Sequence, residues 1–472
     1  MYQKKTKIVA TIGPATSDEK ILTALVKAGL DVVRINFSHG DFAEHQPKVD
    51  RARSIAKKLG KPVAILQDLG GPKIRIGEFY QERVTLKAGT TFTLTTKKVV
   101  GDETKAFINY PKLPKEVKKG GIIFLDDGKK KLEVLETTAD SVKCKILVGG
   151  ECKGRRGVNV PGAYLSISSL TEKDRADLEF GFKNDVDFVA LSFVRRAEDI
   201  KELRQILDKR NKSIKIIAKI ETQEAVDNLD AIIAETDGVM VARGDLAIEV
   251  PAEEVPIIQK LIIQKCNLLG KPVITATQML ESMISSPVPT RAEVNDVANA
   301  IFDGTSAVML SEETTLGKYP LEAVSMMTRI AKRTEEEIEH HEILQDSHLS
   351  SKSVTDAISY SALNIAHEIG AEAIVALSNS GMTARMVARH RPHKPLIVLT
   401  PDQKVYQQLA LSFGCFPVCL TSPIDSVVKA VESSKKTLLA KKLVKKGDKI
   451  VITAGAPFGR SSSTNLLLVQ TV

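Results

Sequence analysis

The stretch IKIIAKIETQEAV at 214–226, followed by DGVMVARGDLAIEV at 237–250, holds two apolar runs that each end in charged residues. Short runs rich in β-branched residues and closed by turn residues predict buried strands. The first strand delivers Lys219 and Glu221 on one side, because residues two apart on a strand face the same way. A buried lysine beside a glutamate is costly unless the two form an ion pair, bind a metal or act in catalysis. Asp245 follows the second strand, so the two runs together predict a divalent-metal site with an ammonium group beside it, with a structural ion pair as the simpler alternative.

The same rhythm of apolar run and amphipathic helix recurs along the chain. It predicts strands at 7–12, 32–37, 63–67, 188–193, 214–220, 238–242, 273–277 and 307–310. A helical pattern follows most of these strands, which is typical of parallel βαβ units. Eight such units predict an α/β fold of the (β/α)8 TIM-barrel class, and a doubly wound open sheet is the alternative.

Two further domains are predicted from breaks in this rhythm. Residues 73–161 show short alternating strands and glycine turn signals without a helical period, which predicts an inserted all-β barrel domain. The polar sequence HHEILQDSHLSSK at 340–352 precedes a smaller open α/β domain. We therefore expect a barrel formed by 1–72 and 162–342, the insertion at 73–161, and a C-terminal domain at 343–472.

The overall composition narrows the class of protein. Hydrophobic residues make up 43% and charged residues 26%, which is ordinary for a soluble globular protein. The net charge of +9 suits a solvated basic surface or small anionic substrates, whereas 4% aromatics and no tryptophan disfavour stacking on nucleic acid. Five cysteines without a C-x-x-C spacing predict a reducing compartment without a zinc site or disulfides. No apolar run reaches membrane length, so we expect a cytoplasmic protein with no nucleic-acid or membrane partner.

Catalytic groups of a barrel gather at the carboxyl ends of its strands. The polar residues predicted there are Arg34, Asn36, Ser38, Asp68, Lys219, Glu221, Arg243, Gly244, Asp245, Thr275, Thr277, Ser311 and Glu313. Two carboxylates suit Mg²⁺ or Mn²⁺, and Lys219 and Arg34 suit a phosphoryl group or an enolate. Gly244 permits close backbone approach, and Thr277 can donate to a carboxylate. These residues together predict a site that binds a small anion with carboxylate and phosphate groups through a metal ion.

Long, ordered motifs extend over nearly the whole chain. They are TKIVATIGPAT, VVRINFSHG, GPKIR, KGRRGVNVPG, AKIE, MVARGDLAIEVP, ITATQMLESM, PTRAEVNDVANA and SEETTLGKYP. In these motifs the chain resembles the pyruvate kinase family. The resemblance implies a phosphotransferase that moves the phosphoryl group of phosphoenolpyruvate to ADP, giving pyruvate and ATP in the last step of glycolysis. A Mg²⁺-dependent lyase or aldolase of pyruvate-like acids, a silent binding protein and a basic RNA-binding protein are the alternatives.

The resemblance also implies roles for individual residues. Lys219, Arg34 and Thr277 would be catalytic, with Lys219 and Arg34 on the phosphoryl group and Thr277 and the Gly244–Asp245 backbone on the substrate carboxylate. Glu221 and Asp245 would hold the Mg²⁺ or Mn²⁺ ion. The implied nucleotide-binding residues are Asn36, Phe37, Ser38, His39, Arg75 and Arg156, the last standing where the family usually has lysine. The insertion would be a mobile lid that excludes water.

The sequence departs from the family pattern in two places, the monovalent-ion site and the end of the eighth strand. Many members bind K⁺ through the equivalents of Asn36, Ser38 and Asp68, a following threonine, and a nearby glutamate. Here Leu69 replaces the threonine and Lys73 the glutamate, so we expect a remnant site, with Lys73 in place of K⁺ and no requirement for that ion. Glu312 replaces a glycine, and no physical consequence follows from the sequence.

The C-terminal domain resembles the regulatory domain of the family. Ser378, Asn379, Ser380, Gly381 and Thr383 form its expected phosphate-binding turn, and Arg460 in the following loop is a candidate effector contact. Met382 stands where many members carry a basic residue, which disfavours a sugar bisphosphate. The resemblance further implies a homotetramer and a phosphorylated allosteric effector, with a helix cap and an ordinary loop as the simpler alternative.

Overall fold

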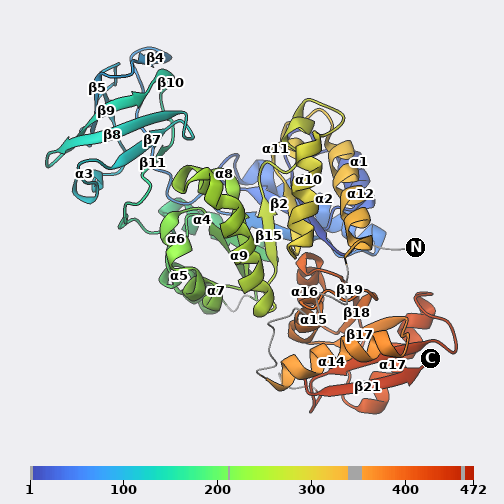
Figure 1. Ribbon diagram of the computed structural model, residues 1–472. Helices are drawn as coiled ribbons and strands as arrows, with labels where there is room; N and C mark the ends of the chain where they lie inside the picture. The colour runs from blue at the N-terminus through green and yellow to red at the C-terminus, as the bar shows by residue number, and fades with distance from the viewer. Residues whose placement is uncertain (1–3, 211–212, 339–352, 459–462) are drawn as a thin grey trace.

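A closed parallel barrel forms the centre of the molecule (Figure 1). The computed structural model describes residues 4–210, 213–338, 353–458 and 463–472. Eight strands close in the order β1-β16-β15-β14-β13-β12-β3-β2. Their bounds are β1 (Lys7–Thr11), β2 (Val32–Asn36), β3 (Ala64–Asp68), β12 (Phe188–Leu191), β13 (Lys215–Ile220), β14 (Gly238–Ala242), β15 (Val273–Ala276) and β16 (Ala307–Leu310). The predicted (β/α)8 barrel is confirmed and the open-sheet alternative is wrong.

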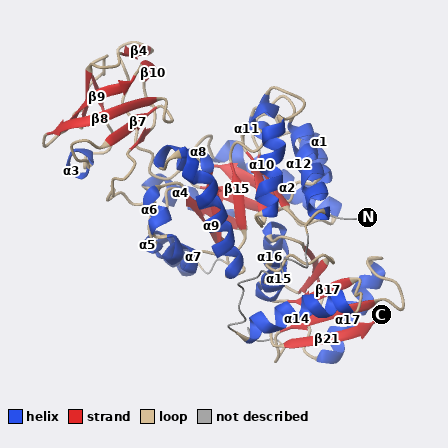
Figure 2. Cartoon of the chain, viewed as in Figure 1, coloured by secondary structure: helices blue, strands red, loops and turns tan. Residues whose placement is uncertain are grey.

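Helices cover the outside of the barrel (Figure 2). They are α1 (Glu19–Ala28), α2 (Phe42–Leu59), α4 (Glu172–Lys183), α5 (Ala197–Lys209), α6 (Gln223–Asp227), α7 (Leu229–Glu235), α9 (Val255–Leu268), α10 (Arg291–Phe302) and α12 (Pro320–Glu336). Helix α4 was not predicted, although Thr171 and Asp174 form a capping box at its start. The helix expected at 222–234 is broken at Asn228 into α6 and α7.

The insertion stands clear of the barrel and has its own core (Figure 1). Its elements are β4 (Arg83–Leu86), β5 (Thr91–Thr95), β6 (Lys105–Phe107), α3 (Leu113–Glu116), β7 (Ile122–Leu125), β8 (Lys130–Thr137), β9 (Ser141–Val148), β10 (Gly150–Lys153) and β11 (Val158–Asn159). The one-turn α3 departs from the expectation of strands alone. At the root, Arg75 pairs with Gly157 in an antiparallel bridge, so the outgoing and returning chains leave the barrel side by side.

The C-terminal domain contains a five-stranded sheet in the order β19-β18-β17-β20-β21. Its strands are β17 (Ala373–Leu377), β18 (Leu396–Thr400), β19 (Cys415–Cys419), β20 (Lys449–Ala454) and the antiparallel β21 (Leu466–Thr471). Its helices are α14 (Val354–Glu368), α15 (Met382–Ala388), α16 (Gln403–Gln408) and α17 (Val427–Ala440). Strand β19 was missed because Pro417 disfavours a strand, but an edge position tolerates proline.

Polar contacts join the C-terminal domain to the amino-terminal end of the barrel. Lys7 Nζ donates to the carbonyl of Cys415 at 2.8 Å, and Lys404 Nζ donates to the carbonyl of Val186 at 2.7 Å. Arg389 donates to the carbonyl of Leu268, also at 2.7 Å. These contacts occur at the bottom of the barrel, opposite the carboxyl ends of the strands, so the C-terminal domain does not cover the site.

One histidine near this contact region makes stability sensitive to acid. Burial lowers the pKa of His390 to about 3, and the neighbouring Arg389 guanidinium, which donates to its Nε2 at 3.3 Å, favours the neutral ring further. The unfolded chain takes up a proton near pH 6.5, whereas the folded chain does not, so stability falls as pH drops from 6.5 toward 3. We expect His390→Gln to remove about 1 kcal/mol of this loss per pH unit. Thermal unfolding of both proteins at pH 7 and pH 5 checks this, and equal losses in the two would contradict it.

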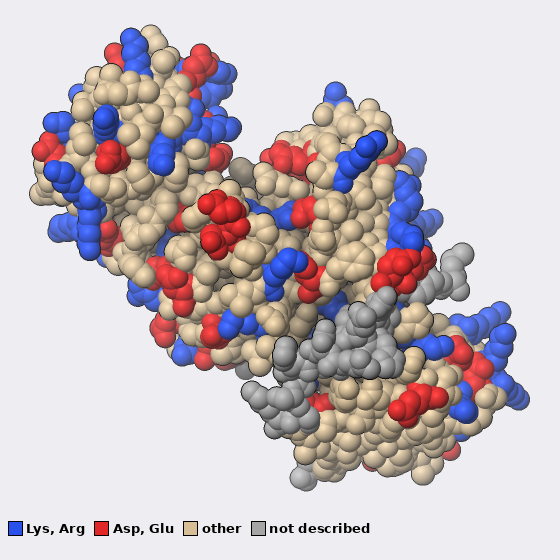
Figure 3. All heavy atoms as spheres, viewed as in Figure 1, with Lys and Arg blue, Asp and Glu red and all other residues tan. Residues whose placement is uncertain are grey.

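The surface on one face carries lysine and arginine interspersed with aspartate and glutamate, without one uniformly basic region (Figure 3). Within the described ranges, no helix has the length and apolar character needed to cross a membrane. The five cysteines are all free thiols. The polar sequence at 340–352 lies outside the described residues.

Candidate active site

Two pairs of neighbouring strands, β2–β3 and β13–β14, bring the predicted charged residues to one end of the barrel. Asn36 and Asp68 are register partners across β2 and β3, and Lys219 leaves β13, which pairs with β14. Helix α8 (Arg243–Glu249) begins directly after β14 and starts with the Arg-Gly-Asp sequence. The parallel arrangement places all of these strand ends at the same rim, where barrel enzymes bind their substrates.

Lys219 lies at the centre of the charged cluster. Its ammonium group is 2.8 Å from a Glu221 carboxylate oxygen and 3.4 Å from an Asp68 oxygen, and it donates to Ser192 Oγ at 2.7 Å. Burial alone lowers the pKa of Lys219, but the charges of Asp68 and Glu221 outweigh this and raise it above its ordinary value. The amine is therefore a permanent cation at neutral pH.

Asp68 is held between two cations. Arg34 donates from Nε to an Asp68 oxygen at 2.7 Å and also donates to Thr11 Oγ1. Burial raises the pKa of Asp68, but Lys219 and Arg34 together bring it below its usual value. The carboxylate thus stays ionised and fixes the positions of Arg34 and Lys219. Cationic groups held in place before a ligand binds need little reorganisation when it does.

Glu221 and Asp245 are the two carboxylates suited to a divalent metal. Glu221 is fully buried; one oxygen accepts from the Phe193 N–H at 2.7 Å, and the other has no hydrogen bond, only the Lys219 ion pair. Burial raises the pKa of Glu221, Lys219 opposes the rise, and Asp245 adds to it. A buried carboxylate oxygen that contacts only the Lys219 ammonium, beside a second carboxylate, fits a hard cation. Within the described ranges there is no group of three or more metal-ligating side chains, so water and substrate would supply the other ligands.

Thr277 and Gly244 meet across the ends of β14 and β15. The Gly244 N–H donates to Thr277 Oγ1 at 2.8 Å, and Thr277 adopts φ +69°, an unfavourable region for a β-branched residue. Arg243 donates to the Thr277 carbonyl at 2.6 Å and forms an ion pair with Asp296 at 2.8 Å. Arg243, which the sequence placed at the strand end, therefore holds the Thr277 turn instead of facing the cavity.

A cavity of about 490 Å³ lies between the insertion and the barrel. Predicted site residues that line it are His39, Lys73, Arg75, Arg156 and Asp245, together with Glu312. Arg156 pairs with Asp126 at 3.3 Å, and Arg75 donates to the Arg155 carbonyl. Burial and then the charges of Lys73 and Arg75 lower the pKa of His39, so its ring is neutral at neutral pH. The insertion thus contributes cationic groups to a cavity whose barrel side carries carboxylates.

The other predicted nucleotide and monovalent-ion residues have structural partners. Asn36 accepts from the Ser38 N–H at 3.0 Å. The Phe37 ring is 1% exposed and packs against Phe180, so only its backbone can reach a ligand. The Leu69 side chain is fully buried among apolar side chains and offers no oxygen, and its backbone carbonyl accepts from Ser192 Oγ at 2.7 Å.

The eighth strand ends in two glutamates with different environments. The Glu313 carboxylate accepts from the Ser311 N–H at 2.7 Å and from the Leu280 N–H at 3.1 Å, so it ties two loops together. Helix α11 (Glu312–Thr315) begins at Glu312, which is exposed on the cavity wall. No consequence of its replacing glycine follows from these contacts.

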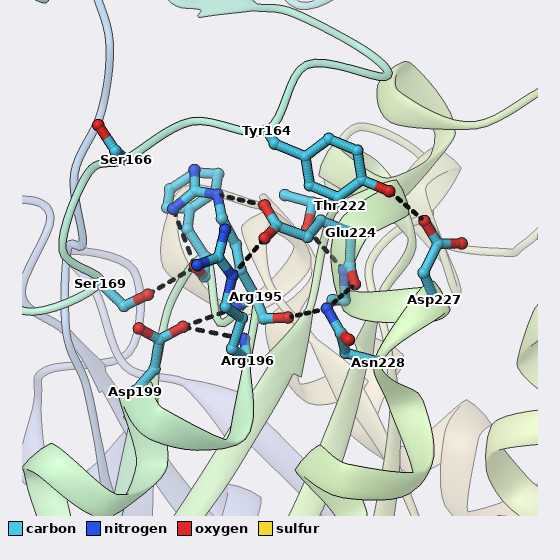
Figure 4. A network of polar contacts seen from close by, with 12 residues as sticks. Tyr164, Ser166, Ser169, Arg195, Arg196, Asp199, Thr222, Glu224, Asp227 and Asn228 are labelled. Atoms are coloured by element: carbon cyan, nitrogen blue, oxygen red, sulfur yellow. Dashed lines mark hydrogen bonds and ion pairs between the residues drawn. The ribbon is translucent and has the colours of Figure 1, made fainter. Parts of the chain in front are cut away.

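A polar network that the sequence did not predict supports the barrel side of the cavity (Figure 4). Ser169 donates to the Phe193 carbonyl at 2.8 Å, which fixes the loop whose N–H holds Glu221. Arg196 donates to Glu224 at 2.6 Å, and Arg195 reaches the same Phe193 carbonyl at 3.4 Å. The sequence offers one indication of this network, which is that Ser192 and Phe193 directly follow a barrel strand.

The predicted effector residues lie on the turn before α15. Gly381 adopts φ +77° before the helix, and Thr383 Oγ1 accepts from Thr464 Oγ1 at 2.8 Å. Arg385 donates to the Ser380 carbonyl at 3.3 Å. Ser378 is buried and Asn379 exposed, and Arg460 lies outside the described residues.

Comparison with known proteins gives concordant similarities. The family described as "Pyruvate kinase, barrel domain" matches residues 3–324, and "Pyruvate kinase, alpha/beta domain" matches residues 356–470. The chain is 47% identical to a pyruvate kinase of Geobacillus stearothermophilus over all of this chain and 81% of that protein. It is 45% identical to one of Clostridium acetobutylicum, over 99% and 100% of the two chains. A solved pyruvate kinase from Cryptosporidium parvum superimposes with a TM-score of 0.95 at 37% identity, over 99% of this chain and 96% of that one.

Proposed function

The chain belongs to the pyruvate kinase family, and from this premise we propose that it transfers the phosphoryl group of phosphoenolpyruvate to ADP and releases pyruvate and ATP. The observation that carries this proposal is the Lys219 ammonium held by Asp68 and Glu221 at the barrel rim. The comparisons give no support to a lyase or aldolase.

The chain's own residues account for substrate binding and charge stabilisation. Thr277 and the Gly244 backbone receive the carboxylate of phosphoenolpyruvate. Arg34 and Lys219 contact the phosphoryl oxygens, and Lys219 also faces the enolate oxygen that gains charge as the phosphorus–oxygen bond breaks. Because Asp68 already fixes both cations, little reorganisation accompanies the reaction. Arg75 and Arg156 receive the phosphates of ADP from the side of the insertion.

Members of this family need a divalent metal, and we propose that Glu221 and Asp245 hold Mg²⁺ or Mn²⁺ here. The open Glu221 oxygen and the adjacent Asp245 support that assignment. When bound, the ion supplies positive charge that offsets the negative charge of the phosphoryl and enolate oxygens.

A coupled assay tests the activity directly. The purified protein is given phosphoenolpyruvate, ADP and Mg²⁺, and pyruvate and ATP are both measured. Equal amounts of the two products are expected. Pyruvate formed without any requirement for ADP and without ATP would contradict phosphoryl transfer to the nucleotide.

We further propose that the enzyme does not need K⁺. The only described ion-pair partners of Asp68 are Arg34 and Lys219, and the buried side chain of Leu69 has no oxygen to act as a ligand. Lys73, exposed on the cavity wall, adds positive charge near this region. Replacing K⁺ by Na⁺ or tetramethylammonium should leave turnover within about twofold, since no cation site is lost. A drop of an order of magnitude or more would contradict this, and Leu69→Thr with Lys73→Glu is the matched variant in which K⁺ dependence is expected to appear.

Three further features concern the assembly of the protein, its effector site and the movement of the insertion. We propose a cytoplasmic homotetramer with a phosphorylated effector bound at the turn 378–383 and the loop containing Arg460. The outer edge of β21 supports self-association, because within the described residues it pairs only with β20 and carries partly exposed leucines. We also propose that the insertion, 73–161, is a lid, which its separate core and narrow root support.

A further inference from the structure

The insertion is joined to the barrel by very few polar contacts. Its two root segments pair with each other, since the Val158 N–H donates to the Ile74 carbonyl and the Ile76 N–H donates to the Arg156 carbonyl. Across residues 73–161, all of which are described, Lys112 and Glu116 contact Ser166 in the segment that returns to the barrel, and one side-chain hydrogen bond reaches a helix of the barrel. Asn159 Nδ2 donates to Glu249 Oε1 at 3.0 Å.

Glu249 connects this contact to the helix that carries Asp245. It is the last residue of α8, whose first turn carries Gly244 and Asp245. Asp245 and Glu249 are four residues apart on one helix and both line the cavity, an arrangement of like charges that is unfavourable by itself. Burial raises the pKa of Glu249, and the hydrogen bond from Asn159 opposes that rise by favouring the carboxylate.

The returning root segment has a second tether beyond the insertion itself. Ser169 donates to the Phe193 carbonyl, and the Phe193 N–H donates to Glu221. Each of the two metal-site carboxylates is therefore linked to the root, Asp245 through α8 and Glu221 through Phe193. The first link differs from the second because its donor, Asn159, belongs to the insertion.

We propose that the Asn159–Glu249 hydrogen bond is a latch that sets the position of the insertion over the cavity and so keeps water from the transferred phosphoryl group. This inference rests on the proposed phosphoryl transfer. Where water attacks phosphoenolpyruvate in place of ADP, the phosphorus–oxygen bond to the enolate breaks and inorganic phosphate forms. The enolate then takes a proton and leaves as pyruvate without ATP. Glu249 and Asn159 are positioning residues, so their loss changes the partition between ADP and water.

The experiment is a double-mutant cycle with Asn159→Ala, Glu249→Ala and the double variant. ATP, inorganic phosphate and pyruvate are measured with phosphoenolpyruvate, ADP and Mg²⁺. In each single variant the ratio of phosphate to ATP should rise about tenfold, the size expected for losing a hydrogen bond to a charged group. The double variant should rise no further than Glu249→Ala, because that substitution already removes the contact with Asn159.

Controls separate the latch from folding and from the proposed function. Glu253→Gln alters an exposed glutamate on the neighbouring 252–254 turn and should leave the ratio unchanged. If Glu249→Ala does not fold, Asn159→Asp, which sets a second carboxylate against Glu249, should raise the ratio at least as much. Unchanged ratios in folded variants, or independent effects that multiply in the double variant, overturn the latch. Absence of ATP from the unmodified enzyme would instead overturn the proposed function.

Discussion

Lys219→Met is expected to lower kcat about 10²–10³-fold while changing KM for phosphoenolpyruvate little. The ammonium group stands where charge grows on the phosphoryl and enolate oxygens, so its loss is felt most in the transition state. Because Asp68 and Glu221 raise the pKa of Lys219, the cation is fully charged below about pH 10.4 and its contribution is lost only at higher pH. The ratio of mutant to wild-type kcat should therefore be flat between about pH 6 and 9.

The same substitution should also reduce stability, since it leaves buried Glu221 without its cation and Asp68 with Arg34 alone. Breaking a buried ion pair costs about 3–5 kcal/mol, which thermal unfolding can measure. Lys215→Met is the matched control, because Lys215 begins the same strand and pairs with Asp237, away from the cavity. Equal losses in kcat and substrate affinity, or unfolding of Lys219→Met alone, would return Lys219 to a structural role.

Glu221→Gln is expected to weaken Mn²⁺ binding by about 10- to 100-fold or more, since even residues behind a ligand have effects of that size. The amide removes one of two negative charges but can still accept from the Phe193 N–H, so the loop should keep its shape. Lys219 retains its ion pair with Asp68. Binding is measured by the magnetic resonance signal of free Mn²⁺ without substrate, which separates metal loss from catalytic loss.

Glu224→Gln is the matched control for this substitution. Glu224 is 6% exposed, lies three residues further on and accepts from Arg196, so it is an equally buried carboxylate with a different partner. Its variant should bind Mn²⁺ as the unmodified enzyme does. Unchanged Mn²⁺ affinity in Glu221→Gln would remove Glu221 from the metal site and leave the ion pair with Lys219 as its sole role.

The barrel strands could be predicted because their signal is local. Runs such as IIAKI and GVMVA are apolar on both faces and are closed by turn residues, and the structure places strands at both. Helix α4 and strand β19 show the limit of this approach. The capping box at Thr171 precedes a weakly amphipathic helix, and Pro417 is acceptable only because tertiary structure puts it at a sheet edge.

The site was predicted in part for a similar reason. Charged residues at strand ends, such as Lys219 and Glu221, are visible as polar exceptions in apolar runs. Ser192 and Phe193 could not be found in this way, because one acts through its contact with Lys219 and the other through its backbone N–H. The role of Arg243 was also hidden, since its direction depends on the turn at Thr277, which only the folded chain defines.

The paired root of the insertion bears on how the barrel closes during folding. Strands β3 and β12 are register partners although Asp68 and Phe188 are separated by the whole insertion. Closing so long a loop costs little more than closing a shorter one, because the entropy grows only with the logarithm of its length. Once the bridge between Arg75 and Gly157 forms, the insertion no longer adds to the loop between β3 and β12. Only the two short root segments and α4 then separate these strands. The length and sequence of an insertion with its own core can thus vary with little effect on the entropy cost of pairing β3 with β12.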